Sequence, residues 1–77
     1  MQDAITAILV EDFDIPAEEL GLDVTFEALG LDSLDVVDLT LALEERTGVK
    51  LEDEELEDVR TIGDAVAKAT AKQAVSA

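Results

Sequence analysis

Apolar residues recur every three or four positions in three stretches of the chain, which is the spacing of one face of an α-helix. The pattern predicts helices over residues 2–13 and 33–47. A further helix is predicted from Ile62, with Thr61 as its N-cap. We expect this last helix to fade into a small, polar and flexible tail over residues 73–77.

The helix over residues 33–47 carries signals for both of its ends. Asp32 stands at the N-cap position, Asp35 follows three residues later, and Gly48 comes directly after the last helical residue. Beyond Gly48, the acidic segment 52–58 contains a single apolar anchor before its end. This segment is predicted to form a short helix.

Residues 14–32 show no sustained period, so we predict a long loop there with a helical turn near residues 17–20. Loops beyond ~12–15 residues are uncommon in compact domains unless they are functional. Five apolar residues are expected to hold the loop against the core: Leu20, Leu22, Val24, Phe26 and Leu29.

No stretch shows the sustained alternation of a β-strand, and 77 residues leave room for one hydrophobic core. The predicted fold class is therefore all-α. We expect a small bundle of three main helices plus one short helix, forming a single domain over residues 1–77.

The helix over residues 33–47 has two apolar edges and an acidic stripe. Successive residues of a helix lie ~100° apart around its axis. One apolar edge consists of Leu34, Val37 and Leu41, and the other consists of Val36, Leu39 and Leu43. The acidic stripe consists of Asp35, Asp38 and Glu45 and ends at Arg46. Val37, Leu39 and Leu43 are expected in the core. For Leu34 and Leu41, both core packing and contact with a partner stay open.

The charge of the chain narrows the choice of partners. Its 20 acidic and 5 basic residues give a formal net charge of −15. Nucleic-acid binding needs clustered Lys and Arg to displace counterions, so nucleic acids and anionic membranes are excluded as partners. A field this negative favours basic surfaces on other proteins. We expect the chain itself to be a monomer.

The side chains used in catalysis are scarce. The chain has no His and no Cys, and Ser33 does not lie in a G-x-S-x-G turn, so we expect no catalytic residue and no enzyme activity. Only carboxylates are present to hold a metal, without the glycine of a calcium loop, and no metal site is predicted.

The sequence contains no cysteine for a disulfide framework, no export signal and no apolar run of the ~20 residues that span a membrane. A cytoplasmic location is therefore expected.

The segment Leu29-Gly30-Leu31-Asp32-Ser33-Leu34-Asp35, followed by Val37-Asp38-Leu39, resembles the modification site and recognition helix of the acyl carrier proteins. The resemblance extends over nearly the whole chain. It implies that a phosphopantetheinyl transferase joins 4′-phosphopantetheine from coenzyme A to Ser33. Acyl groups would then travel as thioesters on that arm.

The resemblance also implies a set of enzymes that the carrier visits in fatty-acid or polyketide biosynthesis: acyl synthases, reductases, dehydratases and acyltransferases with basic docking surfaces. The residues expected to meet them are Asp32, Leu34, Asp35, Asp38, Leu41, Glu44 and Glu45. The pathway stays open, because Leu51-Glu52 replaces the family's usual Ile-Pro and Arg46 interrupts the acidic end of the helix.

Two other functions remain compatible with the sequence. A freestanding aminoacyl or peptidyl carrier would use Ser33 in the same way but carry an amino acid. An acidic helical interaction module would never be modified, and Ser33 would then be an ordinary residue at the start of a helix.

Overall fold

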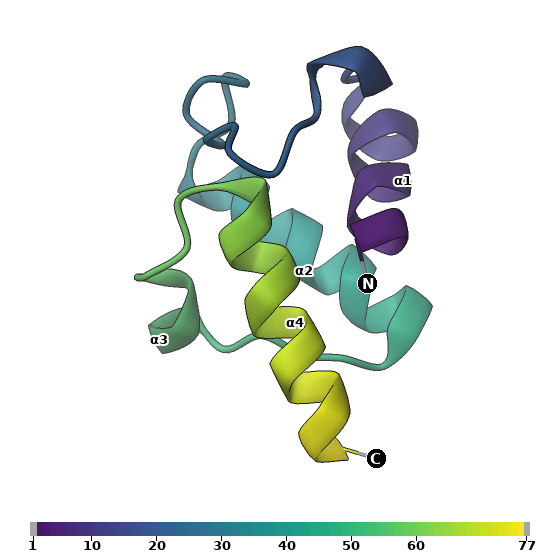
Figure 1. Ribbon diagram of the computed structural model, residues 1–77, viewed down its shortest axis with the longest axis vertical. Helices are drawn as coiled ribbons and strands as arrows, with labels where there is room; N and C mark the ends of the chain where they lie inside the picture. Colours follow the sequence, from purple (N-terminus) through teal and green to yellow (C-terminus); the bar gives the residue numbers. More distant parts are fainter. Residues whose placement is uncertain (1, 77) are drawn as a thin grey trace.

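The computed structural model describes residues 2–76, which form four α-helices joined by irregular segments (Figure 1). The elements are α1 (Gln2–Phe13), the 3-10 helix η1 (Ala17–Glu19), α2 (Ser33–Thr47), α3 (Asp53–Leu56) and α4 (Ile62–Ser76). Over these residues the only β-type pairing is an isolated bridge between Thr25 and Thr61. The predicted all-α class, with three main helices and one short one, is confirmed.

The start of α2 is closed by a reciprocal pair of hydrogen bonds. The Asp35 N–H donates to Asp32 Oδ1 at 3.0 Å, and the Asp32 N–H donates to Asp35 Oδ2 at 3.2 Å. At the other end, Gly48 adopts φ 78° and its N–H donates to the Glu44 carbonyl at 2.7 Å. Both ends of α2 therefore lie where the sequence predicts them, because each is fixed by residues close by in the chain.

The start of α4 is closed in the same manner. The Asp64 N–H donates to Thr61 Oγ1 at 3.0 Å, which confirms Thr61 as the cap. Asp64 Oδ2 in turn accepts from the N–H groups of Arg60 and Thr61, each at 3.1 Å. The helical backbone of α4 continues to Ser76, beyond Gln73 where the sequence pattern fades.

The flexibility expected of the C-terminal tail, residues 73–77, stays a prediction. Ala77 lies outside the described residues.

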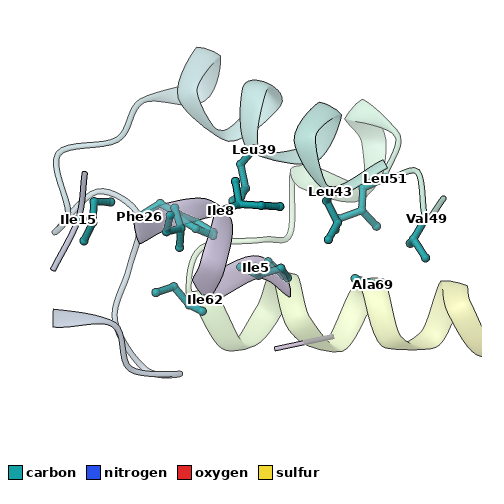
Figure 2. Packing of buried hydrophobic residues seen from close by; sticks show 12 residues of the cluster. Ile5, Ile8, Ile15, Phe26, Leu39, Leu43, Val49, Leu51, Ile62 and Ala69 are labelled. Carbon is teal, nitrogen blue, oxygen red and sulfur yellow. The ribbon is translucent and has the colours of Figure 1, made fainter. Parts of the chain in front are cut away.

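The core lies between α1, α2 and α4 (Figure 2). Figure 2 shows Leu39 and Leu43 pointing from α2 toward Ile5 and Ile8 of α1, with Ala69 of α4 on the other side. Full burial of an Ile or Leu side chain stabilises a fold by ~1.5–3 kcal/mol. The largest fully buried side chains all come from these three helices: Ile5, Ile8, Leu9, Leu39, Leu43 and Ile62.

The loop between α1 and α2 crosses one end of the bundle and is attached there by side chains and backbone (Figure 1). Phe26 is buried, and its N–H donates to the Arg60 carbonyl at 3.0 Å. Leu22 was expected to pack against the core, but its side chain is 48% exposed. Leu22 holds the loop through its carbonyl instead, which accepts from the Gly63 N–H at 2.8 Å.

Helix α3 is a single turn that packs beside α4 through side-chain contacts. Leu56 and Val59 are partly buried against the core. Two lysines of α4 meet carboxylates of this segment: Lys72 Nζ lies 2.6 Å from Glu55 Oε1, and Lys68 Nζ lies 3.8 Å from Asp58 Oδ2. Because α3 is too short to be stable alone, these contacts fix its place next to the first turns of α2.

Candidate functional site

Ser33 is the first residue of α2, and its side chain is exposed. A serine at the start of a helix often serves as the N-cap, but here the carboxylate of Asp32 takes that role. Over residues 2–76 the Ser33 hydroxyl has no hydrogen-bond partner. The hydroxyl is therefore accessible from solvent, and its removal would leave the helix cap intact.

The backbone around Ser33 suits an attached anion. The first N–H groups of a helix have no acceptor within the helix, and the helix dipole favours negative charge at this end. Asp32 accepts from the N–H of Asp35 through its side chain and from that of Val36 through its carbonyl, at 3.0 Å in both cases. The negative charges of Asp32 and Asp35 oppose the attraction of the helix N-terminus for an anion. The net field at Ser33 is the balance between the helix dipole and these two carboxylates.

Two surface grooves meet at Ser33. The first, which we call the loop-side groove, has a volume of about 700 Å³ and lies between the loop and the first turn of α2. Its apolar lining consists of Phe26, Leu31, Val36 and Val59, and its polar lining consists of Thr25, Glu27, Asp32 and Arg60 together with Ser33.

The second groove, which we call the α3-side groove, has a volume of about 300 Å³ and lies between α2 and α3. It is lined by Val36, Val37, Leu56 and Val59, with Asp53, Glu57 and Ser33 at its polar margin. Val37 was expected in the core. It is half-buried and lines this groove, because α3 covers that edge of α2 only in part.

The exposed face of α2 brings several predicted docking residues together. Leu34 is 73% exposed and Leu41 is 52% exposed, which excludes core packing for both. Asp38 and Glu45 are exposed on the same face, since positions three and four apart are neighbours on a helix. Leucines and carboxylates therefore alternate along one accessible stripe.

The remaining predicted docking residues have additional local roles. Asp32 and Asp35 form the capping box of α2, and Asp35 is half-buried. Glu44 is half-buried, and its carbonyl accepts from the N–H of Gly48. Thus the structure places these carboxylates at the two ends of α2, while the middle of the helix presents the stripe.

Two carboxyl groups near the grooves have pKa values below their ordinary range. The N–H groups of Arg60 and Thr61 donate to Asp64 and lower the pKa of that carboxyl. A hydrogen bond from Lys72 lowers the pKa of Glu55 and, in return, raises the pKa of Lys72. Both carboxylates are therefore charged at neutral pH and hold α4 and α3 in place.

Sequence reasoning missed three features of this region: the grooves, the part played by Asp64 and the position of Arg60. The grooves arise where loop, α2 and α3 meet, and no periodicity within one segment reports such a junction. For Asp64, the Thr-x-x-Asp spacing from Thr61 was a readable capping signal. Arg60 lies in a connecting segment without a motif.

Over residues 2–76, no three His, Cys, Asp or Glu side chains are arranged so that they could hold a metal ion. In the same part of the chain, no helix is long and apolar enough to cross a membrane.

The structure is small and helical, and an accessible serine stands at the start of a capped helix beside a face of carboxylates and leucines. These features are typical of the carrier domains that receive a prosthetic arm. The comparisons with known proteins agree. The family model described as "phosphopantetheine attachment site" matches residues 3–68.

Three relatives, each named acyl carrier protein, show similarity over most of their length. The protein from Wolinella succinogenes is 45% identical over 65 residues, which is 83% of this chain and 86% of the relative. The protein from Petrotoga mobilis is 43% identical, with 80% and 74% covered, and that from a Sulfurovum species is 40% identical, with 83% and 87% covered. The chain belongs to the acyl carrier proteins.

Membership of this family establishes the general role of the protein. It is a non-catalytic carrier, its cofactor is 4′-phosphopantetheine, and biosynthetic enzymes and a phosphopantetheinyl transferase act on it. The residues around Ser33 fit that cofactor, because the hydroxyl is exposed and without a partner in the described structure.

Proposed function

We propose that Ser33 is the attachment point and that this protein holds acyl groups there for the enzymes of fatty-acid or polyketide biosynthesis. The observation that carries the proposal is the accessible Ser33 hydroxyl, which is not needed for the helix cap and lies where two grooves meet. When attached, the cofactor supplies a thiol on a long arm. The chain supplies the anchor, the surface that partners bind and two grooves beside the anchor.

The stripe of Leu34, Asp38, Leu41 and Glu45 is the proposed docking surface. Exposed carboxylates attract a basic partner over a distance of about one Debye length, ~8 Å at physiological ionic strength. The two exposed leucines add apolar contact once the surfaces meet. A surface of this size supports short-lived complexes, which suits a protein that must leave each enzyme in turn.

Asp32, Asp35 and Glu44 extend the proposed docking surface at its ends. Asp32 and Asp35 flank Ser33, so any enzyme that reaches the serine also approaches these carboxylates. Since both also close the first turn of α2, their substitution affects helix stability as well as docking. Asp38 is the cleaner probe of docking, because it has no hydrogen bond to another described side chain.

The proposed partners are a phosphopantetheinyl transferase, acyl synthases, reductases, dehydratases and acyltransferases, each with a basic surface at the entrance of its active site. We propose that the protein meets them in the cytoplasm as a monomer. The shared name of the relatives supports acyl cargo rather than aminoacyl cargo. The match to an attachment-site model speaks against a module that is never modified.

A reconstituted acyl-elongation assay tests this function. The chain, loaded with its cofactor, replaces the carrier in a purified bacterial fatty-acid synthase system, and product formation is measured. We expect product with the wild type and with Ser76→Ala, which removes the other serine of the chain, and none with Ser33→Ala. Loaded wild type that supports no elongation here, but does so with a polyketide synthase, would assign the second pathway.

The docking surface is tested in the same assay by Leu41→Ala and Asp38→Asn. Both residues are exposed, so stability should change by less than ~0.5 kcal/mol while the Michaelis constant for the carrier rises. The effect of Asp38→Asn should shrink as salt is added, and that of Leu41→Ala should persist. Unchanged Michaelis constants for both variants would place docking elsewhere.

A further inference from the structure

The five basic residues of the chain divide into two groups. Arg46 pairs with Glu11 at 2.9 Å, and the two lysines of α4 pair with the segment 53–58. Among the described residues, Arg60 and Lys50 form no ion pair. Of these two, Arg60 lines the loop-side groove together with Ser33, and Lys50 lines neither groove.

The backbone of Arg60 is fixed on both sides. Its N–H donates to Asp64 Oδ2 at 3.1 Å, and its carbonyl accepts from the Phe26 N–H at 3.0 Å. Figure 1 shows this segment, just before α4, at the same end of the molecule as the start of α2. The side chain is exposed, so the guanidinium extends from a rigid base at the edge of the groove.

The two grooves differ in their charges. The α3-side groove is lined by the carboxylates of Asp53 and Glu57 and by no basic residue. The loop-side groove is lined by the carboxylates of Glu27 and Asp32, and Arg60 offsets one of them. Because Ser33 lines both grooves, an anion bonded to its hydroxyl is repelled more strongly on the α3 side.

We propose that Arg60 binds the phosphodiester joined to Ser33 and thereby directs the resting arm into the loop-side groove. This inference rests on Ser33 being the attachment point. A guanidinium matches phosphate oxygens with two parallel N–H donors, which a single ammonium group does not. The apolar residues Phe26, Leu31 and Val59 then lie along the path of the arm. Arg60 is thus a positioning residue for the arm.

The test compares backbone amide NMR spectra of the apo and loaded forms of three proteins: wild type, Arg60→Gln and Lys50→Gln. Gln retains the backbone hydrogen bonds of residue 60, and Lys50→Gln matches the change of charge at an exposed position outside both grooves. Intact mass establishes that each protein has gained one phosphopantetheinyl group before the spectra are compared. The phosphorus-31 shift of the phosphodiester is recorded in the same samples.

In the wild type, loading should shift the amides of Thr25, Phe26 and Arg60 more than those of Asp53 and Glu57. In Arg60→Gln the loop-side shifts should fall about two- to fivefold, as expected for the loss of an exposed ion pair, and the phosphorus signal should move. Lys50→Gln should match the wild type. Raising the salt concentration should reduce the wild-type preference toward that of Arg60→Gln.

Two results would overturn the inference and leave the attachment at Ser33 intact: loaded wild type with shifts confined to the α3 side, or Arg60→Gln with the same shifts and phosphorus signal as the wild type. Absence of any mass gain would overturn the attachment as well. The apo spectrum of Arg60→Gln, which should overlay that of the wild type away from residue 60, identifies a variant that has changed its fold.

Discussion

At the scale of single residues, Gly63 is the glycine whose surroundings leave the least room for a side chain. Its N–H donates to the Leu22 carbonyl at 2.8 Å, and a Cβ atom at residue 63 would lie 2.7 Å from that same oxygen. Neither atom can move easily, because the obstacle is backbone. This close approach could not be predicted from the sequence, since a glycine in the first turn of a helix is not in itself a sign of close packing.

Gly63→Ala should therefore lower the free energy of unfolding by ~1–3 kcal/mol, as overpacking does, in a denaturant titration. Gly21→Ala is the matched control. A Cβ there would meet the Asp23 carboxylate at 3.1 Å, which can rotate away, and the change should be neutral or stabilising. Equal stability of the two variants would show that the loop gives way at Leu22.

The residues at the start of α2 show how far local chemistry predicts structure. Asp32, Asp35 and Gly48 act over at most four residues of chain, and the sequence assigned all three correctly. The exposure of Leu34 and Leu41 could not be assigned in the same way, because it depends on where neighbouring elements end. Periodicity shows that a helix is amphipathic and leaves open which part of a broad apolar arc is covered.

At the scale of elements, the start of α4 depends on the charge of Asp64. Hydrogen bonds from the N–H groups of Arg60 and Thr61 lower the pKa of its carboxyl, so folding favours the ionised form. The resulting stabilisation is complete well above the pKa of an unfolded Asp, ~3.9, and is lost as the pH falls through the lower folded pKa.

Asp64→Asn should accordingly lower the melting temperature most at neutral pH. The difference in melting temperature from the wild type should shrink below about pH 4. Thermal unfolding at a series of pH values measures this. Asp12→Asn, which removes an exposed carboxylate of α1 that has no hydrogen bond in the described structure, controls for the loss of one negative charge. A pH-independent deficit in Asp64→Asn would mean that the charge of Asp64 is irrelevant to the cap.

Helix α3 depends on its contact with α4. The hydrogen bond between Lys72 and Glu55 lowers the pKa of Glu55 and raises that of Lys72. The hydrogen bond therefore stabilises the fold at pH values between the pKa of Glu55 and the pKa of Lys72. This stabilisation is lost at low pH, when Glu55 is protonated, and at high pH, when Lys72 is deprotonated.

Lys72→Gln should consequently speed amide hydrogen exchange at Leu56 and Val59 at neutral pH, while exchange in α2 stays at the wild-type rate. Lys50→Gln controls for the loss of one positive charge. Should exchange in α3 be equally slow in both variants, the apolar contacts of Leu56 and Val59 alone would hold this helix.

The two grooves beside Ser33 are formed by several elements together, and they could not be predicted from the sequence. Helix bounds follow from caps and periodicity, which are local. The grooves form only when residues 25–27, the start of α2 and residues 53–60 come together, so their lining is set by tertiary packing. Val37 illustrates the difference, since its helical position was correct and its surroundings were not.

For the whole molecule, the dominant electrostatic quantity is the formal net charge of −15. Carboxylates crowd the segment 52–58 and the face of α2, and they repel one another in the folded state. Salt shortens the range of this repulsion, from a Debye length of ~30 Å at 0.01 M to ~8 Å at 0.15 M.

The melting temperature should therefore rise when salt is added at neutral pH, as followed by circular dichroism. A variant with Glu54→Gln and Glu57→Gln, both exposed, should melt higher at low salt and gain less from added salt. A melting temperature that is the same at both ionic strengths would show that self-repulsion is not what limits stability.

The central claim is that Ser33 carries the cofactor, and one measurement tests it directly. The chain is incubated with coenzyme A, magnesium and a broad-specificity phosphopantetheinyl transferase, and its intact mass is recorded. Wild type and Ser76→Ala should each gain one phosphopantetheinyl group, and Ser33→Ala should gain none. A gain in Ser33→Ala, or no gain in wild type with a transferase active on another carrier, would contradict the assignment of Ser33.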